Sequence, residues 1–144
     1  MWIENLEIKA IYSDKLGVNM QIRVYYEDTD VGGVVYHSNY LNFCERARSE
    51  MFFSKGKNPI LDSGHFVASS LEANFVKPAF FADMLEVKTE LVSLKFASFT
   101  LKQIIYRGEE RVFEMKIKLA YLNHDGTIGR FDDATRTMLK ELLS

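Results

Sequence analysis

Apolar and polar residues alternate strictly in one stretch near the start of the chain. In residues 21–27, Ile22, Val24 and Tyr26 occupy every second position, and each is β-branched or aromatic. Period two with residues of these types predicts a β-strand. Tyr26 shares a face with Val24, so the pattern taken alone predicts that its side chain belongs to the core.

Residues 1–19 precede this strand and carry a weaker pattern. They are mildly amphipathic, and the stretch 15–19 is typical of a turn. An added strand and a flexible arm both fit this N-terminal extension, and the sequence does not separate the two.

After residue 38 the apolar positions change to helical spacing. They recur at i, i+3, i+4, i+7 and i+11, which is the stripe of an amphipathic helix: Tyr40, Phe43, Cys44, Ala47 and Met51. Ser38 or Asn39 is the expected N-cap, and Gly56 is the expected stop. These positions predict a helix of about four to five turns. Tyr40 and Phe43 are expected in the core or in a pocket wall.

Period two returns in the second half of the chain. A short turn or helical piece near 59–63 is expected to lead into four strands. They are predicted near residues 65–77, 85–94, 98–107 and 111–123, with turn signals at 108–110 and 125–126. One strand, a long helix and then antiparallel strands predict an α+β fold, in which a curved sheet wraps around the helix.

A second helix is expected to close the chain over residues 132–143. Asp132 or Asp133 is its expected N-cap, and Ala134, Met138 and Leu142 form its expected inward face. No repeat, low-complexity tract or linker interrupts the pattern. At 144 residues, 1–144 is therefore predicted to be a single domain.

Composition and charge exclude several classes of function. Hydrophobic residues make up 47% of the chain, and the net charge is −2 with no basic stretch, so neither nucleic acid nor a membrane surface is an expected partner. The single cysteine, Cys44, cannot form an intramolecular disulfide. No segment approaches a membrane span or a signal peptide, which predicts a cytoplasmic protein. The three histidines share no ligand spacing, so no metal is expected, and no cofactor is implied.

The loop between the first strand and the helix carries the candidate chemistry. Asp30 lies two residues before Gly32 and Gly33, and His37 stands at the start of the helix. Backbone N–H groups freed by glycine and by a helix start form a natural anion or oxyanion site. A carboxylate beside such a site indicates acyl chemistry.

The run from Tyr25 to Tyr40 resembles the signature of the hotdog-fold acyl-CoA thioesterases of the 4-hydroxybenzoyl-CoA thioesterase family. Its nearest match is the branch associated with the Tol–Pal system, called YbgC-like. The resemblance spans residues 21–123 and is most specific over 23–51. It implies a hotdog fold and a hydrolase of lipid metabolism that splits acyl-CoA thioesters into free acid and coenzyme A.

The same resemblance implies how such a chain assembles. Two subunits would join their sheets into one, with sites at the dimer interface, and a homotetramer would follow. Candidate partners are acyl carrier protein and phospholipid-synthesis enzymes.

Roles for individual residues follow from the resemblance. It makes Asp30 the nucleophile or general base, and it places His37 and Tyr26 in the site. A neutral His37 at the positive end of a helix dipole would donate to the carbonyl. Asp30 could instead be an Asx-turn residue that only shapes the loop, although Asp28 fits that role better. Backbone donors for the oxyanion are expected in the loop or the first helical turn: Gly32, Gly33, Val34 and Val35.

Other residues offer weaker alternatives. Glu45 is a second candidate carboxylate, but its neighbours Arg46 and Arg48 favour an exposed, salt-bridged face. Cys44 lies about 10 Å along the helix from His37, too far for a dyad, and is expected to be a buried small residue. The family often has arginine where this chain has Phe80, so no coenzyme-binding residue is predicted.

The sequence leaves two other functions open. A hotdog acyl dehydratase or hydratase is disfavoured because His65-Phe66 lacks the Pro-Gly that follows the dehydratase histidine. A docking module for acyl carrier or lipid enzymes, with little turnover, is the alternative outside enzymes.

Overall fold

The computed structural model describes residues 18–143. The elements, in chain order, are β1 (Val18–Arg23), the 3₁₀ helix η1 (Tyr26–Asp28), α2 (Asn39–Phe53), β2 (Gly64–Phe75), β3 (Met84–Leu94), β4 (Ser98–Arg107), β5 (Glu110–Asn123) and α3 (Asp133–Leu143). Each of the four predicted later strands is present within a few residues of its expected bounds.

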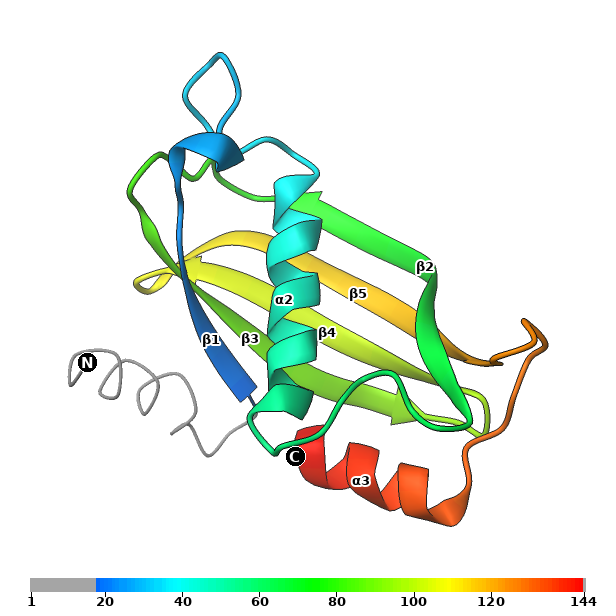
Figure 1. The fold of residues 1–144 in the computed structure, drawn as a ribbon. Coiled ribbons are helices and arrows are strands. Elements are labelled where there is room, and N and C mark those ends of the chain that lie inside the picture. The colour runs from blue at the N-terminus through cyan, green and yellow to red at the C-terminus, as the bar shows by residue number, and fades with distance from the viewer. Residues whose placement is uncertain (1–17, 144) are drawn as a thin grey trace.

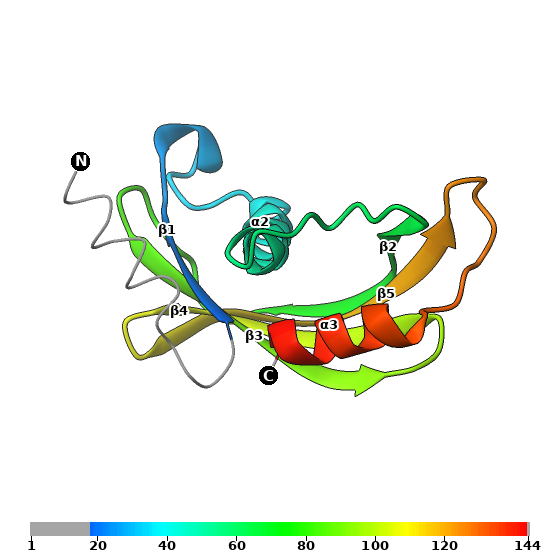
Figure 2. The ribbon, with the colours of Figure 1, turned by 60° about the horizontal axis from the view of Figure 1, so that its bottom comes forward.

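The five strands form one antiparallel sheet in the order β1-β3-β4-β5-β2. Figure 1 shows α2 lying across this sheet, and Figure 2 shows the sheet curving around the helix. The predicted α+β arrangement, a curved antiparallel sheet around a central helix, is therefore confirmed. The strand β2 forms one edge of the sheet and pairs only with β5 among the described strands.

The central helix packs as its periodicity predicts. All five residues of the apolar stripe are buried: Tyr40, Phe43, Cys44, Ala47 and Met51. The helix ends before Gly56, which has a positive φ of 68°. At the other end Ser38 is the N-cap, but its side chain makes no capping bond. Instead, the side-chain amide of Asn39 donates a hydrogen bond of 2.9 Å to the carbonyl oxygen of Asp28, which ties the helix to the loop before it.

The first strand departs from its prediction at both ends. Val18 and Asn19 belong to β1 rather than to a turn, while residues 1–17 lie outside the described part of the chain. The strand ends at Arg23, and the chain enters η1 at Tyr26. The prediction that Tyr26 faces the core with Val24 is wrong, because Tyr26 is 83% exposed.

A carboxylate explains this early ending. The Asp28 side chain accepts a hydrogen bond from the Tyr25 N–H at 2.8 Å, and the Asp28 N–H donates to the Tyr25 carbonyl at 3.0 Å. Local bonds of this kind compete with a strand ladder. The two bonds close a tight turn, and period two is lost at the point where Tyr26 would have pointed inward.

The last helix, α3, lies beside the C-terminal end of α2 at one end of the sheet (Figure 1). Asp132 is its N-cap, as predicted, and accepts from the Thr135 N–H at 2.7 Å. Its buried residues are Leu139, Leu142 and Leu143, whereas Ala134 is exposed, so the predicted inward face is wrong at that position. No helix in the described range 18–143 is long and apolar enough to cross a membrane.

Candidate active site

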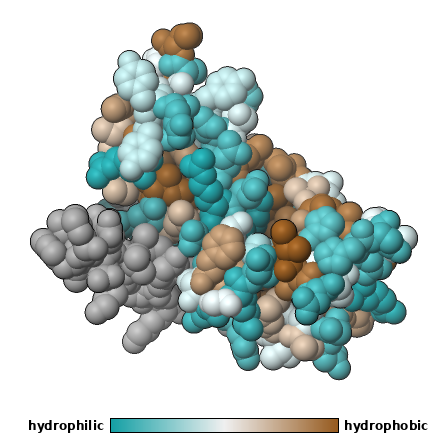
Figure 3. All heavy atoms as spheres, in the orientation of Figure 1, coloured by the Kyte–Doolittle hydropathy of each residue, from teal (hydrophilic) through white to brown (hydrophobic). Residues whose placement is uncertain are grey.

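The loop between η1 and α2 is a small, bonded structure. Its two arms are bridged between Thr29 and Val35, and Val34 forms a second bridge to Phe80. The Asp30 N–H donates to the Val34 carbonyl at 2.9 Å, which closes the tip. The loop therefore presents its tip, residues 30–34, in a fixed conformation at one end of the molecule, and Figure 3 shows a hydrophobic projection at that end.

Asp30 lies at this tip with its side chain exposed. Its Oδ1 accepts a hydrogen bond from the Gly32 N–H at 2.8 Å, and its carbonyl accepts from the Gly33 N–H at 3.0 Å. Gly33 has a positive φ of 79°, which favours glycine. Asp30 thus does form an Asx turn. The turn uses only Oδ1, so a second carboxylate oxygen is held in a defined direction without a partner among residues 18–143.

Asp28 has the opposite environment. It is only 5% exposed, and its carboxylate is bonded to the Tyr25 N–H. Its carbonyl accepts from the Tyr36 N–H and from the Asn39 side chain, both at 2.9 Å. The prediction that Asp28, rather than Asp30, fits the Asx-turn role is wrong. Asp30 forms that turn with the Gly32 N–H, whereas Asp28 holds the loop through the Tyr25 N–H, the Tyr36 N–H and the Asn39 side chain.

The backbone donors of the loop divide into used and unused ones. The N–H groups of Gly32 and Gly33 bond to Asp30, and the Val35 N–H donates to the Ala79 carbonyl at 2.8 Å. Three of the four predicted oxyanion residues therefore have N–H groups that are already bonded. Among residues 18–143, no acceptor is found for the N–H groups of Val31 and Val34 in the loop, or for those of His37 and Ser38 at the helix start.

His37 and Tyr26 lie on the same exposed, aromatic end of the molecule. The His37 ring is 4.4 Å from that of Tyr36 and 6.4 Å from that of Phe75. The Tyr26 ring contacts Phe81 edge-on, with ring centroids 5.5 Å apart. Exposed aromatic side chains at this end of the molecule are typical of a binding surface.

Comparisons with known proteins identify the family of the chain. Residues 32–114 match the model of the thioesterase superfamily. The chain belongs to that superfamily. It is 41% identical to the acyl-CoA thioesterase YbgC of Helicobacter pylori over 134 residues, which cover 87% of this chain and 98% of the relative. It is also 42% identical to the acyl-CoA thioester hydrolase YbgC of Escherichia coli O6:H1 over 92 residues, 61% of this chain and 68% of the relative.

Solved structures give the same result for the fold of this thioesterase. A probable thioesterase from Bartonella henselae is 36% identical, with a TM-score of 0.76, over 81% of this chain and 99% of that one. The predicted hotdog fold, the predicted family with its YbgC-like branch and the prediction of a thioesterase enzyme are confirmed.

Phe80 of the thioesterase, where the family often has arginine, lies beside an arginine from another element. The guanidinium of Arg107, at the end of β4, is 5.7 Å from the Phe80 ring centroid. It donates to Asp83 at 2.8 Å and to the Pro78 carbonyl at 3.1 Å, and it is paired with Glu110. Bonds to the two carboxylates raise the pKa of Arg107. A positive charge therefore lies beside position 80, but it is already paired with Asp83 and Glu110.

Arg48 of the central helix makes a polar contact that the sequence pattern does not predict. The prediction that Arg48 lies with Glu45 on an exposed, salt-bridged face is wrong. Arg48 is half-buried and donates to Gln103 Oε1 at 2.9 Å. Gln103, fully buried on β4, donates at 3.0 Å to the Cys44 carbonyl and to Thr89 Oγ1. The available signal was Gln103 itself, a polar residue at an inward position of an apolar strand.

Cys44 is a buried, unreactive thiol, as predicted for its structural role. Desolvation by burial raises its pKa to about 12. At pH 8 about one thiol in ten thousand is then ionised, and only the thiolate reacts. We expect iodoacetamide to leave native Cys44 unmodified over hours and to modify it fully in denaturant, measured by intact-protein mass spectrometry. Rapid alkylation of the native protein would contradict this burial.

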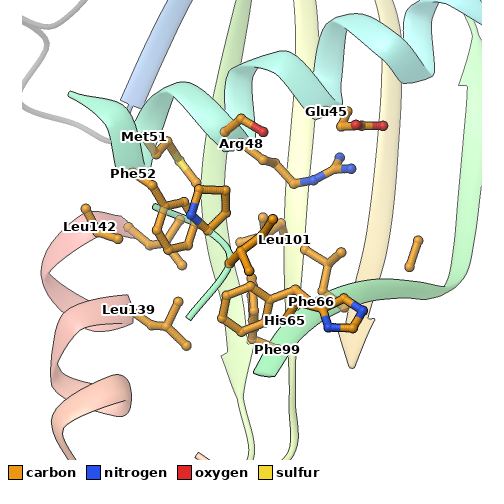
Figure 4. Close-up of a pocket in the computed structure, with 16 residues that line it drawn as sticks. Glu45, Arg48, Met51, Phe52, His65, Phe66, Phe99, Leu101, Leu139 and Leu142 are labelled. Carbon is orange, nitrogen blue, oxygen red and sulfur yellow. The ribbon is translucent and has the colours of Figure 1, made fainter. Parts of the chain in front are cut away.

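A cavity of the thioesterase lies away from the Asp30 loop. It has a volume of about 320 Å³ and is formed by the C-terminal half of α2, the sheet, residues 59–60 and α3 (Figure 4). Arg48 lines it together with apolar side chains. Within residues 18–143, no group of three or more His, Cys, Asp or Glu residues could hold a metal ion.

Proposed function

We propose that this thioesterase hydrolyses acyl-CoA thioesters to a free acid and coenzyme A, with Asp30 as the working carboxylate. The observation that carries the proposal is the pairing at the loop tip of an oriented, exposed carboxylate with unused backbone donors. The YbgC relatives, named as acyl-CoA thioesterases, support the substrate class.

Asp30 can act by either of two routes. Its free oxygen can attack the thioester carbon, expel the coenzyme A thiolate and form a mixed anhydride that water then cleaves. Alternatively it can remove a proton from water as that water attacks. The Gly32 N–H on Oδ1 orients the carboxylate for both routes. Neither route needs a metal or a redox cofactor.

The charge that develops on the thioester oxygen needs donors. Because the Val35 and Gly33 N–H groups are already bonded, we assign this role to the N–H of Val34 or of His37 at the helix start. Preorganised donors stabilise an oxyanion without reorganisation during the reaction. The His37 ring, also at the helix start, is the side-chain donor, and Tyr26 contributes to the wall of the site.

The concave face of the sheet supports assembly of two subunits. Leu71 and Phe75 of β2 pair with the buried Ile117 and Phe113, so they point toward the concave side. Leu71 is nevertheless 42% exposed and Phe75 56% exposed. A second chain joined along the free edge of β2 would cover both residues and give one continuous sheet. We propose this dimer, with two dimers forming a tetramer, in the cytoplasm, and with acyl carrier protein or phospholipid-synthesis enzymes as candidate partners.

The test of this function is thiol release from a panel of acyl-CoAs, from propionyl to palmitoyl and including benzoyl. Turnover of at least one substrate at a rate proportional to protein concentration is the expected result. Absence of thiol release across the panel would refute the proposal. Loss of enoyl absorbance without thiol release would identify a hydratase, and capture of acyl carrier protein without turnover would identify a docking module.

Replacement of His37 by Ala is expected to lower kcat by about a hundredfold, the typical effect of losing one oxyanion donor. His124→Ala is the matched control, because His124 is exposed, bonds the Leu61 carbonyl in the loop before β2 and stacks on His65. Steady-state thiol release from both variants checks the prediction. Equal rates for the two variants would remove His37 from the site.

A further inference from the structure

The cavity beside α3 combines an apolar interior with one charged side chain. Its apolar lining comes from α2, the sheet and α3 and includes these residues: Phe52, Phe66, Phe99, Leu101, Leu139 and Leu142. Figure 4 shows these side chains gathered below α2, with Arg48 reaching from the helix toward the sheet. An engineered cavity of about 150 Å³ binds benzene. A cavity of about 320 Å³ can therefore hold a chain of roughly ten carbon atoms.

No ion pair within the described chain neutralises the charge of Arg48. Its one hydrogen-bond partner is the neutral Gln103, and the ion pairs among residues 18–143 do not include it. Burial lowers the pKa of Arg48, but a guanidinium stays protonated in proteins. A half-buried cation with unused N–H donors at the wall of an apolar cavity favours an anionic ligand, and its planar fork fits a carboxylate.

The other polar groups of the cavity wall limit what can bind. Glu45 and Ser49 line it from α2, and His65 lines it from β2. Glu45 is exposed and close enough to raise the Arg48 pKa, but it makes no ion pair with it. The Glu45 charge opposes an anion. A carboxylate that reaches Arg48 therefore binds against this repulsion, and removal of the Glu45 charge should strengthen its binding.

We propose that this cavity is a binding site for a medium-chain fatty acid, with the carboxylate at Arg48 and the chain between α2, the sheet and α3. The choice of a fatty acid rests on the proposed function, because thioester hydrolysis releases a carboxylic acid. The site is separate from the Asp30 loop within one chain. Asp30 precedes the N-terminus of α2, whereas Arg48 lies nine residues beyond Asn39, or about 13 Å along the helix axis.

Binding of decanoate, decanol and decylammonium to the native protein, measured by isothermal titration calorimetry, tests the head-group preference. Decanoate is expected to bind more tightly than decanol, and decylammonium more weakly. Arg48→Met should weaken decanoate binding by about tenfold or more and leave decanol binding nearly unchanged. Glu45→Gln should tighten decanoate binding. Arg46→Met is the matched control, since Arg46 is exposed on the same helix and should have no effect.

Equal affinity for decanoate and decanol, or the same loss in Arg46→Met as in Arg48→Met, would overturn the site. If the Arg48→Met variant does not fold, photo-crosslinking of the native protein with a diazirine-bearing decanoic acid tests the site instead. Label on the C-terminal half of α2, residues 59–66 or α3 supports the proposal, and label on the Asp30 loop or no label overturns it.

The same measurements separate this site from the proposed function. Decanoate should bind Asp30→Asn as it binds the native protein. A protein that binds decanoate but hydrolyses no thioester would refute the proposed function and leave the binding site standing. A protein that hydrolyses thioesters but does not bind decanoate would overturn this site alone.

Discussion

Asp30→Asn is expected to lower kcat for acyl-CoA hydrolysis by about a thousandfold, within the range for loss of a catalytic acid–base group. An amide is neither a nucleophile nor a base at neutral pH, so both proposed routes stop. The amide oxygen of Asn can still accept the Gly32 N–H that Asp30 Oδ1 now accepts. The loop should therefore keep its conformation, and the thermal midpoint should change little.

Asp28→Asn is the matched comparison for this result. Asp28 is buried, and its carboxylate holds the turn that ends β1. Its replacement should lower stability, while the chemical groups of the site remain in place. Activity measured together with thermal unfolding separates the two effects. An Asp30→Asn variant with native kcat would contradict the assignment, and Glu45 would become the next carboxylate to test.

Phe43→Ala is expected to destabilise the fold by about 3–5 kcal/mol, the usual cost of removing a large aromatic side chain from a core. Phe43 is 0% exposed and lies on the inner face of α2. A domain of this size is stable by only about 5–15 kcal/mol, so the variant should lose a large share of its stability. Urea denaturation of native protein and variant measures the difference.

Phe53→Ala provides the control on the same helix. Phe53 is 51% exposed, so its truncation should cost less than about 1 kcal/mol. The helix loses a side chain of the same type in both variants, and only the burial differs. Similar losses at positions 43 and 53 would show that α2 is not packed against the sheet by the face described.

The central helix and the strands could be predicted because their burial is periodic. The α2 stripe of Tyr40, Phe43, Cys44, Ala47 and Met51 is buried at every position. The strands β3, β4 and β5 show the same regularity. In each case the spacing of the apolar residues matches the geometry of the element. The buried face can therefore be predicted without knowing which residues far along the chain it contacts.

Tyr26 and Arg48 were misplaced because their environments depend on other side chains. Tyr26 continued a period-two pattern that the Asp28 carboxylate ends through its bond to the Tyr25 N–H. Arg48 turned inward because a buried Gln103, 55 residues further along the chain, offers it an acceptor. Neither bond follows from the spacing of apolar residues.

The candidate site likewise has features that the local sequence predicts and features that depend on distant residues. The order of residues was sufficient to place Asp30 and both glycines in one loop, with His37 just before the helix that follows. Which N–H groups stay available was not predictable, because the Val35 N–H is taken by the Ala79 carbonyl from a distant segment. The donors assigned to the oxyanion, Val34 and His37, are among those that remain.

The most direct measurement follows one acyl-CoA with native protein and with Asp30→Asn, recording coenzyme A and free acid in the same sample by mass spectrometry. Native protein is expected to give equal amounts of both products, and the variant is expected to give neither above background. Coenzyme A released without the free acid, or equal product formation by the two proteins, would contradict it.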